Sequence, residues 1–291
     1  MEEMRNDWNL LKDKLEIDII KKYARYTNMV TTTVIVFCYI CIFTITIFQR
    51  LPLIFDIILP LNGSRPYQLI LTTEYFVNQD KYIQLILLHE FLVGCIGFTT
   101  VWGTGASIIV YLTHLCALLE IASYRIDNAI DRNILAMPSP KKQYLLHRRI
   151  VNAVVMHQRA AEFNDFMTSV FLIPFALLIV VGVSSLTLSL FLLCRLILSN
   201  NISKALVIVI LTLAHLIYLF IANYCGQVVI NNGIDLFKAT YNGLWYAAPL
   251  STQKLLLFIM QRGRENLTIS CFSIFIASLD GFATVKLKNL L

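Results

Sequence analysis

The side chains of this sequence that could take part in chemistry stand singly inside long apolar runs. His215 and Tyr218 are three positions apart, so a helix would place both polar tips on one face. A polar tip surrounded by apolar residues needs a hydrogen-bonding partner, so these two residues are the best candidates for a binding surface, with plain packing as the alternative for each one taken alone. Glu90, which follows His89 in a second apolar run, is either a functional group or an inexpensive charge near a membrane interface.

No pattern in the sequence is typical of an enzyme or of a metal centre. There is no Ser/His/Asp, HExxH or paired-carboxylate arrangement placed at one depth. His147 and His157 are ten positions apart, with no carboxylate or thiol at ligand spacing. Cys38 and Cys41 match the CxxC pattern, but inside an apolar segment they are more simply small packing residues. We therefore expect no catalytic residue, no metal and no cofactor.

The composition is that of an integral membrane protein. Of 291 residues, 57% are hydrophobic and 14% are charged, and the mean hydropathy is +0.69, which is too apolar for an ordinary soluble domain. The net charge of +6 is spread through the segments between apolar runs, so nucleic-acid binding has no support. We predict an all-α, multi-pass helical bundle in the lipid bilayer, with about five spanning helices.

The apolar runs give the order of the elements. The predicted spans are residues 28–49, 82–116, 168–197 and 204–227, with a last one from about Ile269. The chain then divides into an amphipathic cytosolic segment (1–27), two spans (28–116) with an extracellular loop (50–81), a cytosolic helical hairpin (117–167), two further spans (168–227), and a non-spanning helix followed by the last apolar helix (228–291).

The hairpin has one plausible turn, Met137-Pro138-Ser139-Pro140, because paired prolines break a helix. The amphipathic patterns on either side predict helices over 117–133 and 142–166.

Basic residues predict the orientation in the membrane. Seventeen of the 24 lysines and arginines lie before the first span, in the hairpin or in the segment before the last span. The positive-inside rule therefore places the N-terminus in the cytosol and the C-terminus outside. Two of the three N-glycosylation sequons, at Asn62 and Asn201, then lie outside the cell, where they can be modified, whereas Asn266 lies in the cytosol.

Spaced residues in the last part of the chain form a long signature. They are Phe237, Tyr241, Asn242, Trp245, Tyr246, Pro249, Gln253, Lys254, Leu255, Met260, Gln261, Arg262 and residues 278–283 (SLDGFA). They resemble the C-terminal signature of insect odorant receptors, particularly the hymenopteran set. Asn6-Asp7-Trp8-Asn9 and the segment from His157 to Phe163 (HQRAAEF) resemble two further segments of these receptors.

This resemblance implies a subunit of a heteromeric, ligand-gated, non-selective cation channel that serves the sense of smell. A variable odorant-binding subunit assembles with a shared co-receptor, as a tetramer, in the plasma membrane of olfactory sensory neuron dendrites. The family's last helix is split, which makes residues 250–264 a cytosolic anchor helix and the segment from Ile269 a truncated pore-lining helix. The residues then implied as the subunit anchor are Tyr241, Trp245, Tyr246, Pro249, Lys254 and Asp280.

A small, volatile, apolar ligand would bind in a mostly apolar cavity in the outer half of such a bundle. Its higher affinity for the open state would shift the equilibrium of the channel. The candidate lining residues, from the first, second and fourth spans, are Phe43, Thr44, Ile47, Phe91, Cys95, Leu211, His215 and Tyr218.

The chain departs from the family pattern at both ends. In the family two spanning helices precede the first segment seen here, and the last helix continues beyond the position of Leu291. An incomplete or non-functional receptor fragment is therefore one alternative. A multi-pass transporter is another, although the halves of the chain show none of the internal repeats that transporters tend to have.

Overall fold

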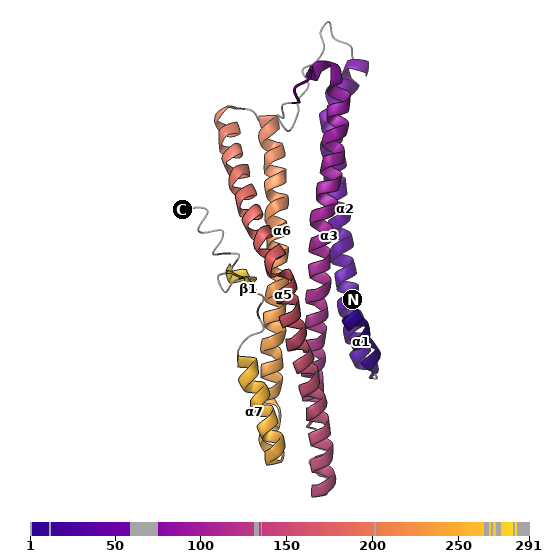
Figure 1. Ribbon diagram of the computed structural model, residues 1–291, viewed down its shortest axis with the longest axis vertical. Coiled ribbons are helices and arrows are strands. Elements are labelled where there is room, and N and C mark those ends of the chain that lie inside the picture. The colour runs from indigo at the N-terminus through magenta and orange to yellow at the C-terminus, as the bar shows by residue number, and fades with distance from the viewer. Residues whose placement is uncertain are drawn as a thin grey trace. The chain divides into compact units, whose positions relative to one another are not determined.

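The computed structural model of the protein describes residues 2–11, 13–58, 75–130, 134, 136–200, 202–264, 268, 270–271, 275–281 and 283. Its helices are α1 (Glu2–Leu10), α2 (Lys14–Ile58), α3 (Gln79–Asp127), α5 (Ser139–Leu198), α6 (Ile202–Asn242) and α7 (Leu250–Arg264), with the 3-10 helix η1 (Trp245–Ala247) before α7 (Figure 1). Two short strands, β1 (Ser270–Cys271) and β2 (Phe275–Ile276), form an antiparallel pair.

The helices are grouped into two compact units. The first unit comprises Met1–Thr27, Ile108–Ser184 and Leu216–Leu291, and the second unit comprises Asn28–Ser107 and Ser185–His215. The helices α2, α3, α5 and α6 contribute residues to both units. The first unit thus collects the segments predicted to be cytosolic, together with the adjoining parts of the spans.

Within the described residues, four helices are long and apolar enough to cross a membrane: Lys14–Leu51, Lys81–Asp127, Pro140–Leu198 and Lys204–Asn242. The shortest has 38 residues, which is about 57 Å at the rise of an α-helix, whereas the hydrocarbon core is about 30 Å thick. Each of these helices therefore continues well outside the lipid. The predicted all-α, multi-pass class is confirmed.

The predicted loop over residues 50–81 is shorter in the structure. α2 continues to Ile58 and α3 begins at Gln79. Residues 51–58 are mostly apolar and contain no glycine or asparagine, and the helix continues through Pro52. The predicted glycosylation sites, Asn62 and Asn201, lie outside the described residues.

The first helix of the hairpin ends earlier than predicted. α3 ends at Asp127 and not at Asn133, and the Asn128 side chain donates a hydrogen bond to the Tyr124 carbonyl at 2.8 Å at this end. α5 begins at Ser139, with one proline of the predicted turn on each side of it. A proline in the first turn of a helix is well tolerated, since its missing N–H would have no partner there.

The predicted start of the pore-lining helix at Ile269 is wrong. β1 and β2 occupy part of that segment, and helical structure begins at Leu279. Ser278 explains this start, because its Oγ accepts a hydrogen bond from the Gly281 N–H at 3.0 Å, as an N-cap residue does. Residues 284–291 of the predicted helix lie outside the described residues.

The segment after β2 packs on α6. A Cβ added to Gly226 would lie only 2.7 Å from the Cβ of Ala277, so only glycine allows this approach. The next residue, Gln227, accepts a hydrogen bond from the Leu279 N–H at 3.2 Å. These two positions of α6 therefore dock the start of the C-terminal helical turn.

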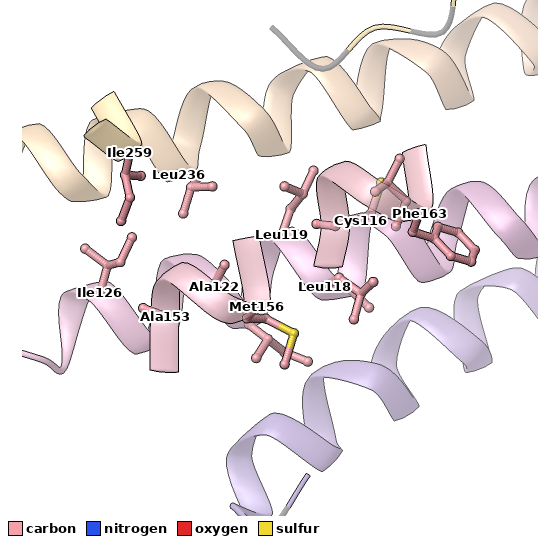
Figure 2. Close-up of a cluster of buried hydrophobic side chains, with 14 of the residues drawn as sticks. Cys116, Leu118, Leu119, Ala122, Ile126, Ala153, Met156, Phe163, Leu236 and Ile259 are labelled. Carbon is pink, nitrogen blue, oxygen red and sulfur yellow. The ribbon is translucent and has the colours of Figure 1, made fainter. Parts of the chain in front are cut away.

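The hydrophobic core of the first unit lies among α3, α5, α6 and α7 (Figure 2). On α3, Leu115, Leu119 and Ala122 recur at helical spacing and are completely buried. Ile150 on α5 and Val229 on α6 are also completely buried. Burying one leucine or isoleucine contributes about 1.5–3 kcal/mol, so this core is a main source of stability for the first unit.

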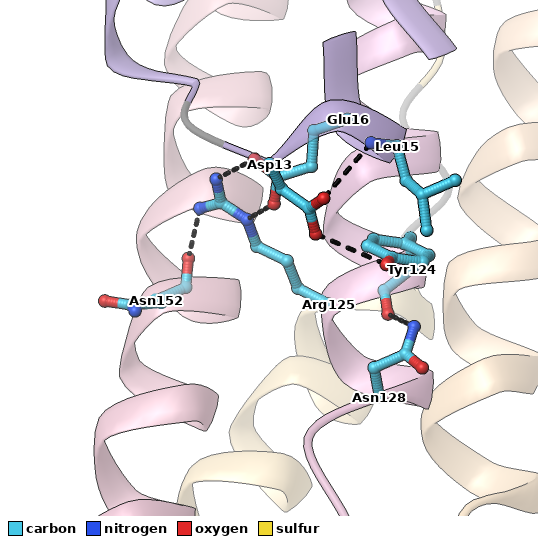
Figure 3. Close-up of polar contacts among 7 residues, drawn as sticks. All are labelled: Asp13, Leu15, Glu16, Tyr124, Arg125, Asn128 and Asn152. Carbon is cyan, nitrogen blue, oxygen red and sulfur yellow. Dashed lines mark hydrogen bonds and ion pairs between the residues drawn. The ribbon is translucent and has the colours of Figure 1, made fainter. Parts of the chain in front are cut away.

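Polar contacts join the start of α2 to α3 and α5 (Figure 3). Asp13 caps α2, since its Oδ1 accepts the Leu15 N–H at 3.1 Å. The Glu16 carboxylate accepts two hydrogen bonds from Arg125, at 2.6 and 2.9 Å. Arg125 also donates to the backbone carbonyl of Asn152 at 3.0 Å. One guanidinium thus links three helices of the first unit.

In the second unit, α2 and α3 run antiparallel. Their contacting pairs are Tyr39 with Thr99, Phe43 with Phe91, and Gln49 with Glu90. Threonine hydroxyls along these helices donate to backbone carbonyls one turn earlier, as Thr44 does to Ile40 at 2.8 Å. Such bonds allow threonine to lie in an apolar environment.

Candidate functional site

Seven of the eight predicted ligand-lining residues belong to the second unit. The structure brings Phe43 and Phe91 together, with ring centroids 5.8 Å apart and the ring planes tilted by 50°. Thr44 lies beside them on α2, where its hydroxyl is bonded to its own helix. Phe43 and Ile47 are 53% and 58% exposed, so much of each side chain faces away from the other helices of the second unit.

The remaining candidates lie on α3 and α6. Cys95, Leu211 and His215 are half-buried in the second unit. Tyr218 is also half-buried, but it belongs to the first unit. A role for these residues in ligand binding stays a prediction.

A polar pair joins α2 and α3 inside the second unit. Gln49 Nε2 donates a hydrogen bond to Glu90 Oε2 at 2.8 Å, and Gln49 is only 8% exposed. Sequence reasoning considered Glu90 but missed Gln49, which it placed at the end of a span. The signal that could have found it is spacing, because Gln49 stands seven positions after Ile42, on the same buried stripe of α2.

A second polar contact lies next to this pair. The Tyr75 hydroxyl is 3.1 Å from Nδ1 of His89, and the two rings meet edge to face with centroids 5.7 Å apart. His89 precedes Glu90 on α3, so two successive residues of α3 make polar contacts.

In the first unit, the Asp7 carboxylate of α1 is shared by two other helices. It accepts a hydrogen bond from Arg159 of α5 at 3.0 Å and lies 3.1 Å from Nε2 of His114 of α3. The His114 ring meets the Phe163 ring edge to face at 5.0 Å. Asp7, Arg159 and Phe163 all belong to the segments that carry the receptor resemblance, whereas sequence reasoning missed His114.

Two further contacts tie α2 to α3 and α6. Lys22 forms an ion pair with Glu120 at 3.0 Å, although 65% of the Lys22 side chain is exposed. The Tyr23 hydroxyl donates a hydrogen bond to Asn232 Oδ1 at 3.1 Å. Together with the Asp7 contacts, these bonds fix the amphipathic N-terminal segment onto the first unit.

The predicted subunit-anchor residues lie around η1 and α7. Trp245 packs against the core of the first unit, whereas Tyr241 and Tyr246 are 60% and 65% exposed. Leu250 and Phe258 of α7 are also largely exposed. Large exposed apolar side chains are typical of a surface that contacts another protein or a membrane.

The other predicted anchor residues have different surroundings. The Pro249 carbonyl accepts the Thr252 N–H at 2.9 Å and so begins the hydrogen bonding of α7. Lys254 on α7 and Asp280 after β2 are exposed. A role for these residues in subunit contact stays a prediction.

His157 is a buried titratable residue of α5 before the predicted span at 168–197. Its side chain lies in the first unit, and it is 7% exposed. Burial, reinforced by the positive charge of Arg262 on α7, lowers the pKa of His157 below its ordinary value. The folded first unit therefore favours the neutral imidazole.

The described part of the chain brings together no group of three histidine, cysteine or acidic side chains that could hold a metal ion. The described residues instead form apolar helices, with a hydrogen-bonded pair of Gln49 and Glu90 in the second unit and several ion pairs in the first unit.

These features define the class of the protein as a multi-pass, helical membrane protein. A sequence model described as 7tm Odorant receptor matches residues 2–287. The chain belongs to the 7tm odorant receptor family, and the resemblance seen in its sequence is confirmed.

Solved structures agree with this assignment at the level of the fold. The insect olfactory receptor OR5 from Machilis hrabei, in complex with eugenol, is 16% identical with a TM-score of 0.59, over 91% of this chain and 68% of that chain. A second structure of that receptor is 16% identical with a TM-score of 0.56, over 91% of this chain and 67% of that chain. No curated protein matches the sequence.

Proposed function

We propose that this chain is an odorant receptor subunit that binds small, volatile, apolar ligands and gates a non-selective cation channel together with a co-receptor. The observation that carries the proposal is the family match over residues 2–287. The similar fold of an insect olfactory receptor, whose structure contains eugenol, supports a volatile ligand of comparable size.

The ligand is proposed to act on the second unit. The aromatic pair of Phe43 and Phe91 supports this, because the two rings, which join α2 and α3, offer faces and edges to an apolar molecule. A ligand with higher affinity for one arrangement of these helices would shift the population of that arrangement.

The first unit is proposed to hold the subunit contacts. The exposed Tyr241, Tyr246, Leu250 and Phe258 support this, since a water-exposed helix rarely presents such side chains unless another protein covers them. The proposed partner is the shared co-receptor in a hetero-tetramer, and the proposed location is the plasma membrane of olfactory sensory neuron dendrites. The excess of basic residues in the first unit's segments supports a cytosolic side for it.

Current recording tests this proposal. Cells that express the full chain with an odorant receptor co-receptor should pass an inward cation current when a panel of volatiles is applied. Cells that express the co-receptor alone are the control. If the chain reaches the cell surface and no volatile evokes a current beyond that control, the proposal fails and the alternative of a non-functional receptor fragment takes its place.

A further inference from the structure

The hydrogen-bonded pair of Gln49 and Glu90 joins α2 and α3 within the second unit, where Gln49 is buried and Glu90 is half-buried. Gln49 stands two positions before Leu51, where the apolar part of α2 ends, and Glu90 stands nine positions after Lys81, where the apolar part of α3 begins. An ionisable residue in the apolar part of a spanning helix is a functional candidate.

Both residues occupy positions that apolar residues otherwise fill. On α3, Glu90 follows the buried Ile83 and Ile86 at intervals of three and four residues. On α2, Gln49 follows the buried Ile42 two turns later. Aliphatic residues at these two positions would complete the packing without any polar group to satisfy. The pair is therefore not explained by packing alone.

One atom of the pair has unused bonding capacity. Glu90 Oε2 accepts the hydrogen bond from Gln49, whereas Glu90 Oε1 is buried and accepts no hydrogen bond from any residue that the structure describes. Arg50, the next residue on α2, also has a buried Nε without an acceptor among the residues that the structure describes. A buried acceptor without a donor carries a large desolvation cost.

We propose that Glu90 Oε1 is an acceptor subsite that selects ligands with a hydroxyl donor, namely volatile alcohols and phenols. The O–H of such a ligand donates to Oε1 and removes the desolvation cost, whereas an ether or hydrocarbon of the same shape leaves the acceptor unpaired. Gln49 holds the carboxylate in place through Oε2. This inference rests on the proposed function, and it adds a chemical class of ligand to the apolar contacts.

Isomer pairs that differ only in the donor test the subsite. The probes are 1-octanol with heptyl methyl ether, and 2-phenylethanol with benzyl methyl ether. In cells that express the chain with the co-receptor, the alcohol should activate at a concentration about tenfold lower than its isomer, which corresponds to about 1.4 kcal/mol. Glu90→Leu should abolish this preference, and Glu90→Gln, which keeps an acceptor oxygen without the charge, should reduce it.

The matched control is Glu162→Leu, which removes a second Gln–Glu pair. Gln158 donates to Glu162 at 3.0 Å on α5 of the first unit, and this variant should keep the full preference for alcohols. Cell-surface labelling corrects for differences in expression. If Glu90→Leu does not reach the surface, the comparison between wild type and Glu90→Gln decides.

A second measurement separates this inference from the proposed function. The thermal midpoint of the purified full chain is measured with each isomer. Stabilisation by the alcohols alone, lost in Glu90→Leu, supports the subsite even if no current is seen. Equal responses to both isomers in the wild type overturn the subsite and leave the receptor function intact. A preference that survives in Glu90→Leu, or no effect of any probe in either measurement, also overturns the subsite.

Discussion

The Asp7 carboxylate accepts a hydrogen bond from Arg159 at 3.0 Å, although 152 positions separate the two residues in the chain. The same carboxylate lies 3.1 Å from His114, and only 13% of the Asp7 side chain and 6% of the His114 side chain are exposed. One acidic residue of α1 therefore connects α3 and α5 within the first unit.

Removing this charge should destabilise the first unit. We expect Asp7→Asn to lower the free energy of unfolding by about 2 kcal/mol, because Arg159 and His114 would remain in place without the negative charge that faces them. The thermal midpoint of the purified full chain measures this change. The control is Asp235→Asn, since Asp235 pairs with Lys238 at 3.3 Å and both side chains are more than 60% exposed. The role assigned to Asp7 is wrong if both variants shift the midpoint equally.

The guanidinium of Arg125 should not be replaceable by lysine. Arg125 makes two bonds to Glu16 and one to the Asn152 carbonyl, and a lysine ammonium cannot reproduce this fork. We expect Arg125→Lys to lower the free energy of unfolding by about 1–2 kcal/mol. Lys22→Gln, at the exposed pair with Glu120, should change it by less than about 0.5 kcal/mol. A larger effect at Lys22 than at Arg125 would contradict this account.

The approach of the C-terminal segment to α6 should depend on Gly226. Gly226→Ala adds a methyl group that overlaps Ala277, so the segment after β2 must move away from α6. We expect faster proteolysis of this segment in the variant. Gly263→Ala is the control, because its added Cβ would lie 3.6 Å from Phe237, an ordinary contact distance. Equal proteolysis rates for the two variants would show that the docking on Gly226 is not required.

Stability of the first unit should fall on mild acidification. The pKa of His157 is lowered in the folded state, so the folded protein binds this proton more weakly than the unfolded chain does. The contribution of the neutral imidazole to the free energy of unfolding is therefore fully present above the unfolded pKa of about 6.5, and it is lost as the pH falls below that value. The thermal midpoint of the wild type should therefore be lower at about pH 5.5 than at about pH 7.5, which lie on either side of the unfolded pKa of about 6.5. His157→Gln should show a smaller drop. An identical drop in both proteins would assign the pH dependence to other groups.

The sequence was sufficient to predict the class of the protein, but it did not predict the contacts between the helices. Apolar runs long enough to cross a bilayer were sufficient to predict the class, and the spaced signature around Trp245 was sufficient to predict the family. The contact between Asp7 and Arg159 was not predictable, although both residues stood in recognised segments, because it depends on how α1 packs against α5. The spacing from Ile42 could have indicated that Gln49 is buried, but its bond to Glu90 depends on how α2 packs against α3.

Helix ends were the least predictable part of the fold. Prolines suggested the hairpin turn, but the end of α3 depends on the local bonding of Asn128. The start of the last helical turn depends on Ser278, whose side chain acts as a cap only because the preceding residues form β2 and pack on α6. The second of these ends depends on a tertiary contact, between Gly226 and Ala277, that no single segment contains.

A volatile ligand is proposed to act on the second unit of this chain. Dose–response currents of Phe91→Ala, recorded with the co-receptor, test it most directly, because Phe91 contacts Phe43 across α2 and α3. We predict that the half-maximal concentration of an activating volatile rises about tenfold, or about 1.4 kcal/mol. Phe191→Ala, at an exposed phenylalanine of the same unit, should leave it within about twofold. Unchanged half-maximal concentrations in both variants, at equal surface expression, would contradict the claim.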